Sequence, residues 1–236
     1  MRTSQTVAIV IAALLGCSVE ADPKPEDLAA TVAGIRQRMH VRYAGAKLAR
    51  IAIAHGDLEL ARAQARLVAA QGEPDLLPEW KPFIANVQVS ATAIADAKDT
   101  VAASRAFAAL GKQCAACHAA VPAKIVFADI AVPRPATSQA SAMAEHEWAT
   151  SLMWEGLIGP APDRWNSGAE MLQRARLTIV AEADVGTKHL GLNDDIARVR
   201  TFATKARAAK TTDERAQIYG DLLATCAHCH QTIRDR

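Results

Sequence analysis

The pattern of apolar and polar positions predicts a helical chain. Apolar residues, alanine above all, are spread among polar ones without the strict alternation of a half-buried strand. Glycine and proline gather at a few sites and divide the chain into segments of helical length. Because alanine has the highest helix propensity of all residues, we expect helices throughout.

Capping residues, glycines and prolines separate four expected helices in the first half of the chain. The expected starts are Glu26, Asp57, Pro82 and Asp99 or Thr100, and the first three helices end near Ala54, Gln71 and Ala97. The second half repeats this order from Ser138, with Pro160 and Pro162 in its first turn. Short loops between long helices are typical of an antiparallel four-helix bundle.

An internal repeat supports this division. Cys114 and Cys226 are 112 residues apart, and the residues around them match at this shift. Upstream, a shift of 106 residues matches His40 with His146 and Asp57 with Asp163, so the second copy is expected to carry an insertion of six residues, within 184–193. The predicted fold is all-α, with two tandem antiparallel four-helix bundles. The expected organisation is a leader at 1–21, a first bundle at 22–131, a linker at 132–137 and a second bundle at 138–236.

The leader has the pattern of a secretory signal. Arg2 precedes an apolar run from Val7 to Leu15, which is too short to remain as a membrane helix. The residues up to Cys17 are similar to the lipobox of bacterial lipoproteins, which predicts lipidation of Cys17; cleavage after Ala21 is the alternative. No other stretch is apolar enough to span a membrane.

Composition and motifs exclude several classes of function. The formal net charge is +2, so neither nucleic acid nor an acidic partner is indicated. We find no nucleophile beside a positioned base, no phosphate-binding loop and no carboxylate pair at a catalytic spacing. The chain is therefore not expected to be an enzyme.

Two copies of one short motif carry the predicted chemistry. Four of the five cysteines lie in C-x-x-C-H motifs, formed by Cys114, Cys117 and His118 and by Cys226, Cys229 and His230. This spacing is the attachment sequence of c-type haem. The two thiols form thioethers with the porphyrin, and the histidine that follows is placed to bind the iron. We therefore predict two covalently attached c-type haems, with His118 and His230 as proximal ligands.

Other cysteine chemistry fits this pattern less well. A zinc site gathers four ligands within one small domain, whereas Cys117 and Cys226 are 109 residues apart. A thioredoxin-like pair lies beside a βαβ pattern, and none is present here.

The late position of each motif points to a family. Four helices with C-x-x-C-H near the end of the fourth resemble class II cytochromes c, the cytochrome c′ and cytochrome c556 type. The resemblance covers nearly the whole chain twice, but it is specific only at the haem motifs. It implies a sixth iron ligand from a methionine of the first helix, as in c556, or an open site, as in cytochrome c′.

This chain departs from both patterns because it offers His40 and His146 as distal ligands, on the side of the iron opposite the proximal histidine. At 1.5 Å per residue, His40 lies almost level with His118 in an antiparallel bundle, and His146 with His230. Rivals are Met39 and Met143 and, in the second half, His189. We expect His55 at the far end of the bundle, His228 facing solvent or a propionate, and Arg42 on a solvated helix face.

These features predict a dihaem cytochrome that carries single electrons in the bacterial cell envelope. Bis-His ligation leaves no open site on iron and favours electron transfer. A protein that binds NO or CO at open haems is the alternative, and a dihaem peroxidase is the less favoured one. The expected partners are redox proteins, with membrane contact only through a lipid anchor. The location would be the periplasm or the outer membrane, and homo-oligomers are possible.

Overall fold

The computed structural model describes residues 25–72, 77–121, 125–175 and 190–234. Within these ranges the chain forms eight α-helices and one short 3-10 helix, and no strand is present there. The predicted all-α class is therefore confirmed for the described residues. None of their helices is both long and apolar enough to cross a membrane. The leader, with Cys17, lies outside these ranges.

The helices of the first half begin and end close to their predicted positions. They are α1 (Pro25–Ala54), α2 (Leu58–Ala70), α3 (Lys81–Ala95) and α4 (Thr100–Ala120), with the 3-10 helix Pro78–Trp80 before α3. Gly56 has a φ of 70°, a conformation that glycine adopts without a Cβ clash, and it ends α1. Asp57 then caps α2, where its side chain accepts from the Leu60 amide at 3.0 Å.

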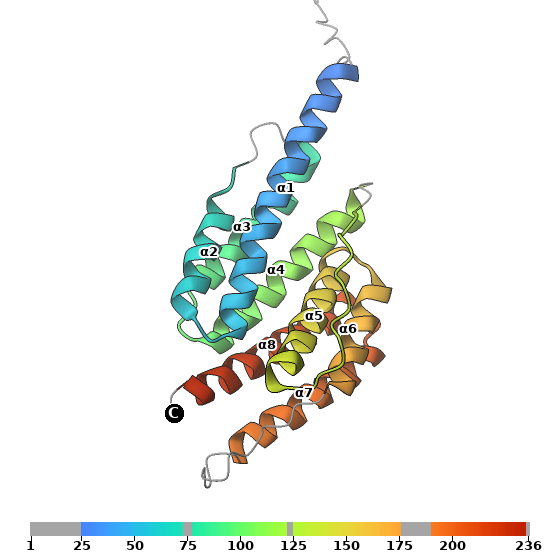
Figure 1. Cartoon of the computed structure of the whole chain (residues 1–236). Coiled ribbons are helices and arrows are strands. Elements are labelled where there is room, and N and C mark those ends of the chain that lie inside the picture. Colours follow the sequence, from blue (N-terminus) through green and yellow to red (C-terminus); the bar gives the residue numbers. More distant parts are fainter. Residues whose placement is uncertain (1–24, 73–76, 122–124, 176–189, 235–236) are drawn as a thin grey trace, which may run out of the picture.

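The second half forms four further helices. They are α5 (Gln139–Ile158), α6 (Pro162–Arg174), α7 (Leu190–Ala208) and α8 (Thr212–Arg234). Ser138 caps α5 by accepting from the Ser141 amide, and Glu214 accepts from the amides of Lys210 and Thr211 just before α8. Figure 1 shows the two groups of four helices lying against each other.

The structure corrects the register of the repeat. Helices α1 and α5 end at Ala54 and Ile158, and α2 and α6 both have 13 residues, so 104 residues separate the halves here rather than 106. The predicted match of Asp57 with Asp163 is wrong because Asp57 caps α2 from outside, whereas Asp163 lies within α6. The predicted shift of 112 residues does hold for α4 and α8, which begin at Thr100 and Thr212.

Helices α4 and α8 pack against each other in opposite directions at the centre of the molecule. A Cβ atom added to Gly220 would lie 3.1 Å from that of Ala108, and Lys112 pairs with Asp213 at 2.8 Å. Since Lys112 follows Ala108 but Asp213 precedes Gly220, the two helices are antiparallel. Their C-terminal ends, which carry the two motifs, therefore lie at opposite ends of this pair.

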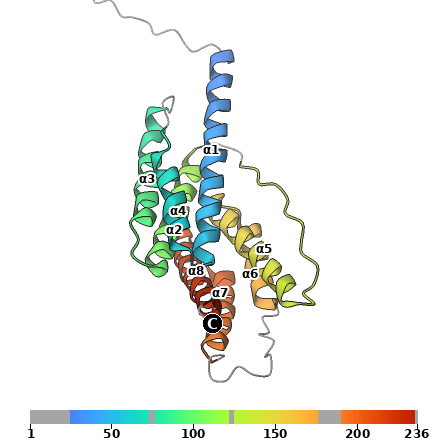
Figure 2. The same ribbon diagram turned by 60° about the vertical axis from the view of Figure 1, so that its left-hand side comes forward.

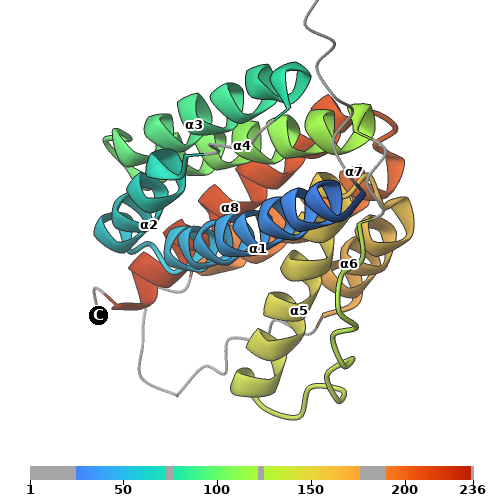
Figure 3. The ribbon, with the colours of Figure 1, turned by 90° about the horizontal axis from the view of Figure 1, so that it is seen from above.

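The first helix of each half packs on the last helix of the other half. Helix α1 contacts α8 more extensively than it contacts α4, and α5 contacts α4 more extensively than α8. Figures 2 and 3 show the C-terminal part of α1 reaching α8. One hydrophobic cluster consequently contains buried residues from both halves.

Aromatic side chains fill the middle of this cluster. The rings of Phe107 and Trp154 are 4.5 Å apart, and those of Trp154 and Tyr219 are 6.0 Å apart. Phe107 and Tyr219 have no exposed surface and Trp154 only 1%. Burial of each such ring contributes about 3 kcal/mol to the free energy of folding. The core thus ties the two halves together midway between the two motifs.

Candidate functional site

The second motif borders a cavity of about 340 Å³. Cys226, Cys229 and His230 line it from the last turns of α8, and His146 lines it from α5. The remaining walls come from α7 and from the end of α1. This volume lies within the range of about 300–1,000 Å³ typical of ligand pockets.

His146 carries an orphan polar atom in this cavity. Its Nε2 is buried and has no hydrogen-bond partner among the described residues, which is unusual for a buried polar atom. Burial, with a smaller contribution from the neighbouring His230, lowers the pKa of His146 to about 4. The imidazole is therefore neutral near pH 7, the form that binds a metal ion.

His230 faces the same cavity in a fixed orientation. Its Nδ1 lies 2.7 Å from the carbonyl oxygen of Ala54, at the end of α1. A carbonyl only accepts, so Nδ1 carries the hydrogen and Nε2 keeps its lone pair for a metal. The imidazoles of His146 and His230 thus line the same cavity, and their binding to the iron of a second haem stays a prediction.

His55 lies near this site, which the sequence analysis did not predict. Its ring is 4.9 Å from that of His230 in an edge-to-face arrangement, and it lines the cavity. We expected His55 to lie far from the haem site because we assumed that α1 packs only against helices of its own half. Because α1 ends against α8, His55 is instead placed beside the second motif.

Arg50 is a second residue that the sequence analysis missed. It comes from α1, is 2% exposed and lines the cavity of the second motif. Its guanidinium donates to the hydroxyls of Thr150 and Ser151 on α5, at 3.0 and 2.9 Å. No pattern in the sequence separates it from the other arginines of α1, because its partners are about 100 residues away.

The first motif repeats the orientation of the second. The Nδ1 atom of His118 lies 2.7 Å from the carbonyl oxygen of Ile158, at the end of α5. Ala54 and Ile158 occupy equivalent positions in the corrected register. Burial raises the pKa of Cys114 and of Cys226 to about 12 and keeps both as thiols, and none of the four motif cysteines forms a disulfide.

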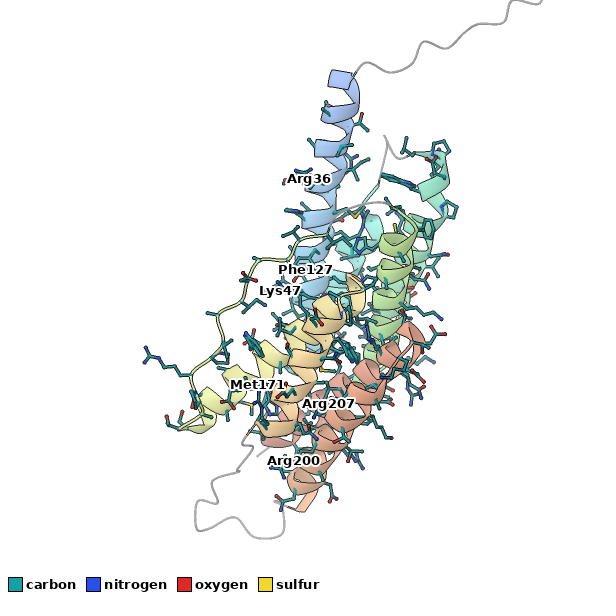
Figure 4. The ribbon with its side chains drawn as sticks, turned by 90° about the vertical axis from the view of Figure 1, so that its right-hand side faces the viewer. Arg36, Lys47, Phe127, Met171, Arg200 and Arg207 are labelled. Carbon is teal, nitrogen blue, oxygen red and sulfur yellow. The ribbon has the colours of Figure 1, made fainter. Side chains whose placement is uncertain are left out.

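The segment that follows α4, which contains Phe127, packs next to the first motif. Phe127, labelled in Figure 4, lies 6.1 Å from the ring of Tyr43 on α1, and Arg164 of α6 lies over its face. The ring of Phe127 also occupies the space beside Gly159, which directly follows Ile158. A side chain at Gly159 would collide with this ring, so the glycine lets Phe127 cover the end of α5.

His40 and His146 do not occupy equivalent positions in the two halves. His40 is exposed on α1, and the 104-residue register pairs it with Ala144. The residue that corresponds to His146 is Arg42, which is buried rather than solvated as expected. The sequence match was two residues out of register, so the argument from matched positions for His40 no longer holds.

The sequence analysis also considered His228 and His189. His228 is exposed, as predicted, and its Nδ1 lies 2.8 Å from the carboxylate of Asp195, a buried residue of α7. His189, the rival ligand, lies outside the described residues.

The second site suits a c-type haem by its donor set. The imidazoles of His55, His146 and His230 line one cavity whose surface is mostly apolar, and two thiols stand at the spacing that thioether attachment requires. Among the described residues, no three or more His, Cys, Asp or Glu side chains are grouped so as to hold a bare metal ion. A haem does not need such a group, because the porphyrin supplies four of the ligands of its iron.

Comparisons of this chain with protein-family models, with curated proteins and with solved structures find no match.

Proposed function

We propose that the protein is a dihaem c-type cytochrome that carries single electrons. The observation that carries the proposal is the cavity of the second motif, where the orphan Nε2 of His146 and the oriented ring of His230 meet. A haem bound there supplies an iron that gains or loses one electron. Two imidazole ligands leave that iron no free position, which favours electron transfer over ligand chemistry.

The residues of the second site have distinct roles in this proposal. Cys226 and Cys229 would hold the porphyrin through thioethers, and the imidazoles of His230 and His146 would bind its iron. The Ala54 carbonyl keeps His230 in the tautomer that binds metal. Around them, Ile196 and Val199 of α7 give the cavity an apolar wall that limits the access of water.

We further infer that the two haems belong to one unit made of two four-helix modules, α1–α4 and α5–α8. Each module supplies the carbonyl that orients the proximal histidine of the other, which supports a joint assembly over two independent bundles. The shared aromatic core lies between the motifs. Electrons can therefore enter at one end of the α4–α8 pair and leave at the other.

The place of action in this proposal is the bacterial cell envelope. Attachment of haem to C-x-x-C-H requires export in bacteria, as the resemblance implies, and the leader has the pattern of an exported protein. Lipidation at Cys17 would anchor the protein to the outer membrane, with redox proteins as partners.

A redox titration followed by absorption spectroscopy tests this function. The full chain, produced in a host that attaches c-type haem, should show two reversible one-electron steps and a low-spin second haem in both oxidation states. A second haem that is high-spin in the unaltered ferric protein would contradict the assignment of His146.

A further inference from the structure

A buried cation, Arg50 of α1, forms part of the wall of the cavity at the second motif. The residue is 2% exposed, and its guanidinium donates to the hydroxyls of Thr150 and Ser151 on α5, at 3.0 and 2.9 Å. The hydroxyl of Tyr219 is a third contact. All three partners are neutral oxygens, so none of them carries a charge opposite to that of the guanidinium.

The charge of Arg50 is not paired with a carboxylate. Its Nε atom is buried and has no hydrogen-bond partner among the described residues. None of the ion pairs found within the described ranges includes Arg50. Two buried carboxylates near it have other partners, since Glu155 pairs with Arg164 and Asp195 is hydrogen-bonded to His228.

A buried arginine without an anion is an incomplete arrangement. The guanidinium keeps its proton at any pH at which the protein folds, so the charge cannot be removed by titration. A buried charge that lacks an opposite charge is strongly unfavourable. Its planar fork of N–H donors matches a carboxylate best. Because Arg50 lines the cavity, an anion that completes the arrangement would lie in that cavity.

Arg50 lies close to the residues that would bind the iron of the second haem. On α1 it is one turn before Ala54, whose carbonyl orients His230. On α5 its partner Thr150 is one turn after His146. A haem bound by these two histidines would share the cavity with Arg50, and the carboxylates that a haem brings are its two propionates.

We propose that Arg50 binds a carboxylate inside the cavity of the second motif, and that this carboxylate is a propionate of the second haem. The inference deepens the proposed function and rests on it, since it needs a haem at Cys226 and Cys229. Asp195 lines the cavity from α7 and disfavours an anion on that side, so the charges of the wall place the carboxylate at Arg50. The first half of the chain thus contributes a binding residue to the haem of the second half.

The test is infrared spectroscopy of the dihaem protein with carbon-13 in the carboxyl groups of its haem propionates. Feeding the host δ-aminolevulinic acid labelled at its carboxyl carbon introduces the label. The difference between the spectra of the labelled and the unlabelled protein then isolates the propionate bands. A free carboxylate such as acetate has the same chemistry but carries no label, so the spectra separate the two sources.

The variants should change these bands in a graded way. Arg50→Leu should shift one propionate band, because a buried propionate loses its opposite charge. Arg50→Lys should give a smaller shift, since it keeps the charge but loses the fork. Arg66→Leu, at an exposed arginine of α2, is the matched control and should reproduce the bands of the unaltered protein.

Unchanged propionate bands in an Arg50→Leu protein that carries both haems would overturn this inference. They would mean that Arg50 binds a free anion or none. If Arg50→Leu does not fold, Arg50→Lys decides, and bands identical to those of the unaltered protein would again overturn it. Failure of the proposed function has a different signature, because a chain without a haem at the second motif shows no labelled propionate there, and the inference then fails with it.

Discussion

The imidazole of His230 donates its Nδ1 hydrogen to the carbonyl of Ala54, although the two residues lie 176 positions apart in the chain. His118 makes the same bond to Ile158. Each proposed proximal ligand is therefore oriented by the last residue of the other half's first helix. Such a hydrogen bond fixes the tautomer and the ring plane of a histidine, so each half depends on the other for the orientation of its motif histidine.

Replacement of His146 tests the distal ligand of the second haem. His146→Ala should turn one haem high-spin and let it bind CO when reduced, while its covalent attachment and the first haem stay unchanged. The reason is that the only imidazole facing His230 from α5 is lost. Ferric EPR and CO-difference spectra measure this change.

His40→Ala is the matched control for that substitution, because His40 is exposed on the equivalent helix. It should leave the spectra of both haems as they are. Low-spin signals from both haems in the His146→Ala protein would show that another residue, such as His189, binds the second iron.

Replacement of Arg50 tests the tie between the halves. Arg50→Ala removes two hydrogen bonds between α1 and α5 and leaves space at a position only 2% exposed. The free energy of unfolding should fall by about 2 kcal/mol, with the second haem absorbing as a more heterogeneous species. Chemical denaturation followed by circular dichroism measures the loss. Arg66→Ala should change stability by less than about 0.5 kcal/mol, and an equal loss in both variants would contradict the buried role of Arg50.

Gly111 tests the packing of α4 against α5 just before the first motif. A Cβ atom there would lie 2.7 Å from Trp154 and 2.8 Å from Leu157, both fully buried. Gly111→Ala should therefore lower the free energy of unfolding by about 1–3 kcal/mol. Gly72→Ala, which meets no atom within 4 Å, is the control and should be neutral. If the thermal melts of Gly111→Ala and Gly72→Ala coincide, α4 and α5 do not pack this closely at Gly111.

The lowered pKa of Glu214, at the start of α8, predicts that the free energy of unfolding depends on pH. Its carboxylate accepts from the amides of Thr211 and Lys210, which lowers its pKa below the usual 4.5. A lowered folded-state pKa means that the stabilisation is complete above the unfolded-state pKa. It is lost as the pH falls through the lower folded-state pKa. Glu214→Gln should therefore flatten the stability curve below about pH 5, as measured by urea denaturation at several pH values. If the free energy of unfolding of Glu214→Gln and of the unaltered protein changes with pH in parallel, this role of Glu214 is contradicted.

Local structure could be predicted from the sequence because its signals are local. Asp57 and Asp99 cap helices where expected, Gly56 ends α1, and the C-x-x-C-H motifs lie on the fourth helix of each half. These features depend on a few adjacent residues, so the pattern alone places them within one or two positions.

Relationships between distant helices could not be predicted in the same way. The match of Asp57 with Asp163 compared a capping residue with one inside a helix, and the two-residue error paired His146 with His40 instead of Arg42. Arg42 and Arg50 look like surface residues in the sequence, because the residues that cover them come from other helices. The contact of His55 with His230 likewise depends on packing between the halves.

Intact mass spectrometry of the exported protein under denaturing conditions is the most direct test of the haem assignment. The account predicts the mass of the mature chain plus two haem groups, with one haem lost in Cys114→Ser/Cys117→Ser and one in Cys226→Ser/Cys229→Ser. A colourless protein at the bare polypeptide mass, or one that carries zinc at these cysteines, would contradict it.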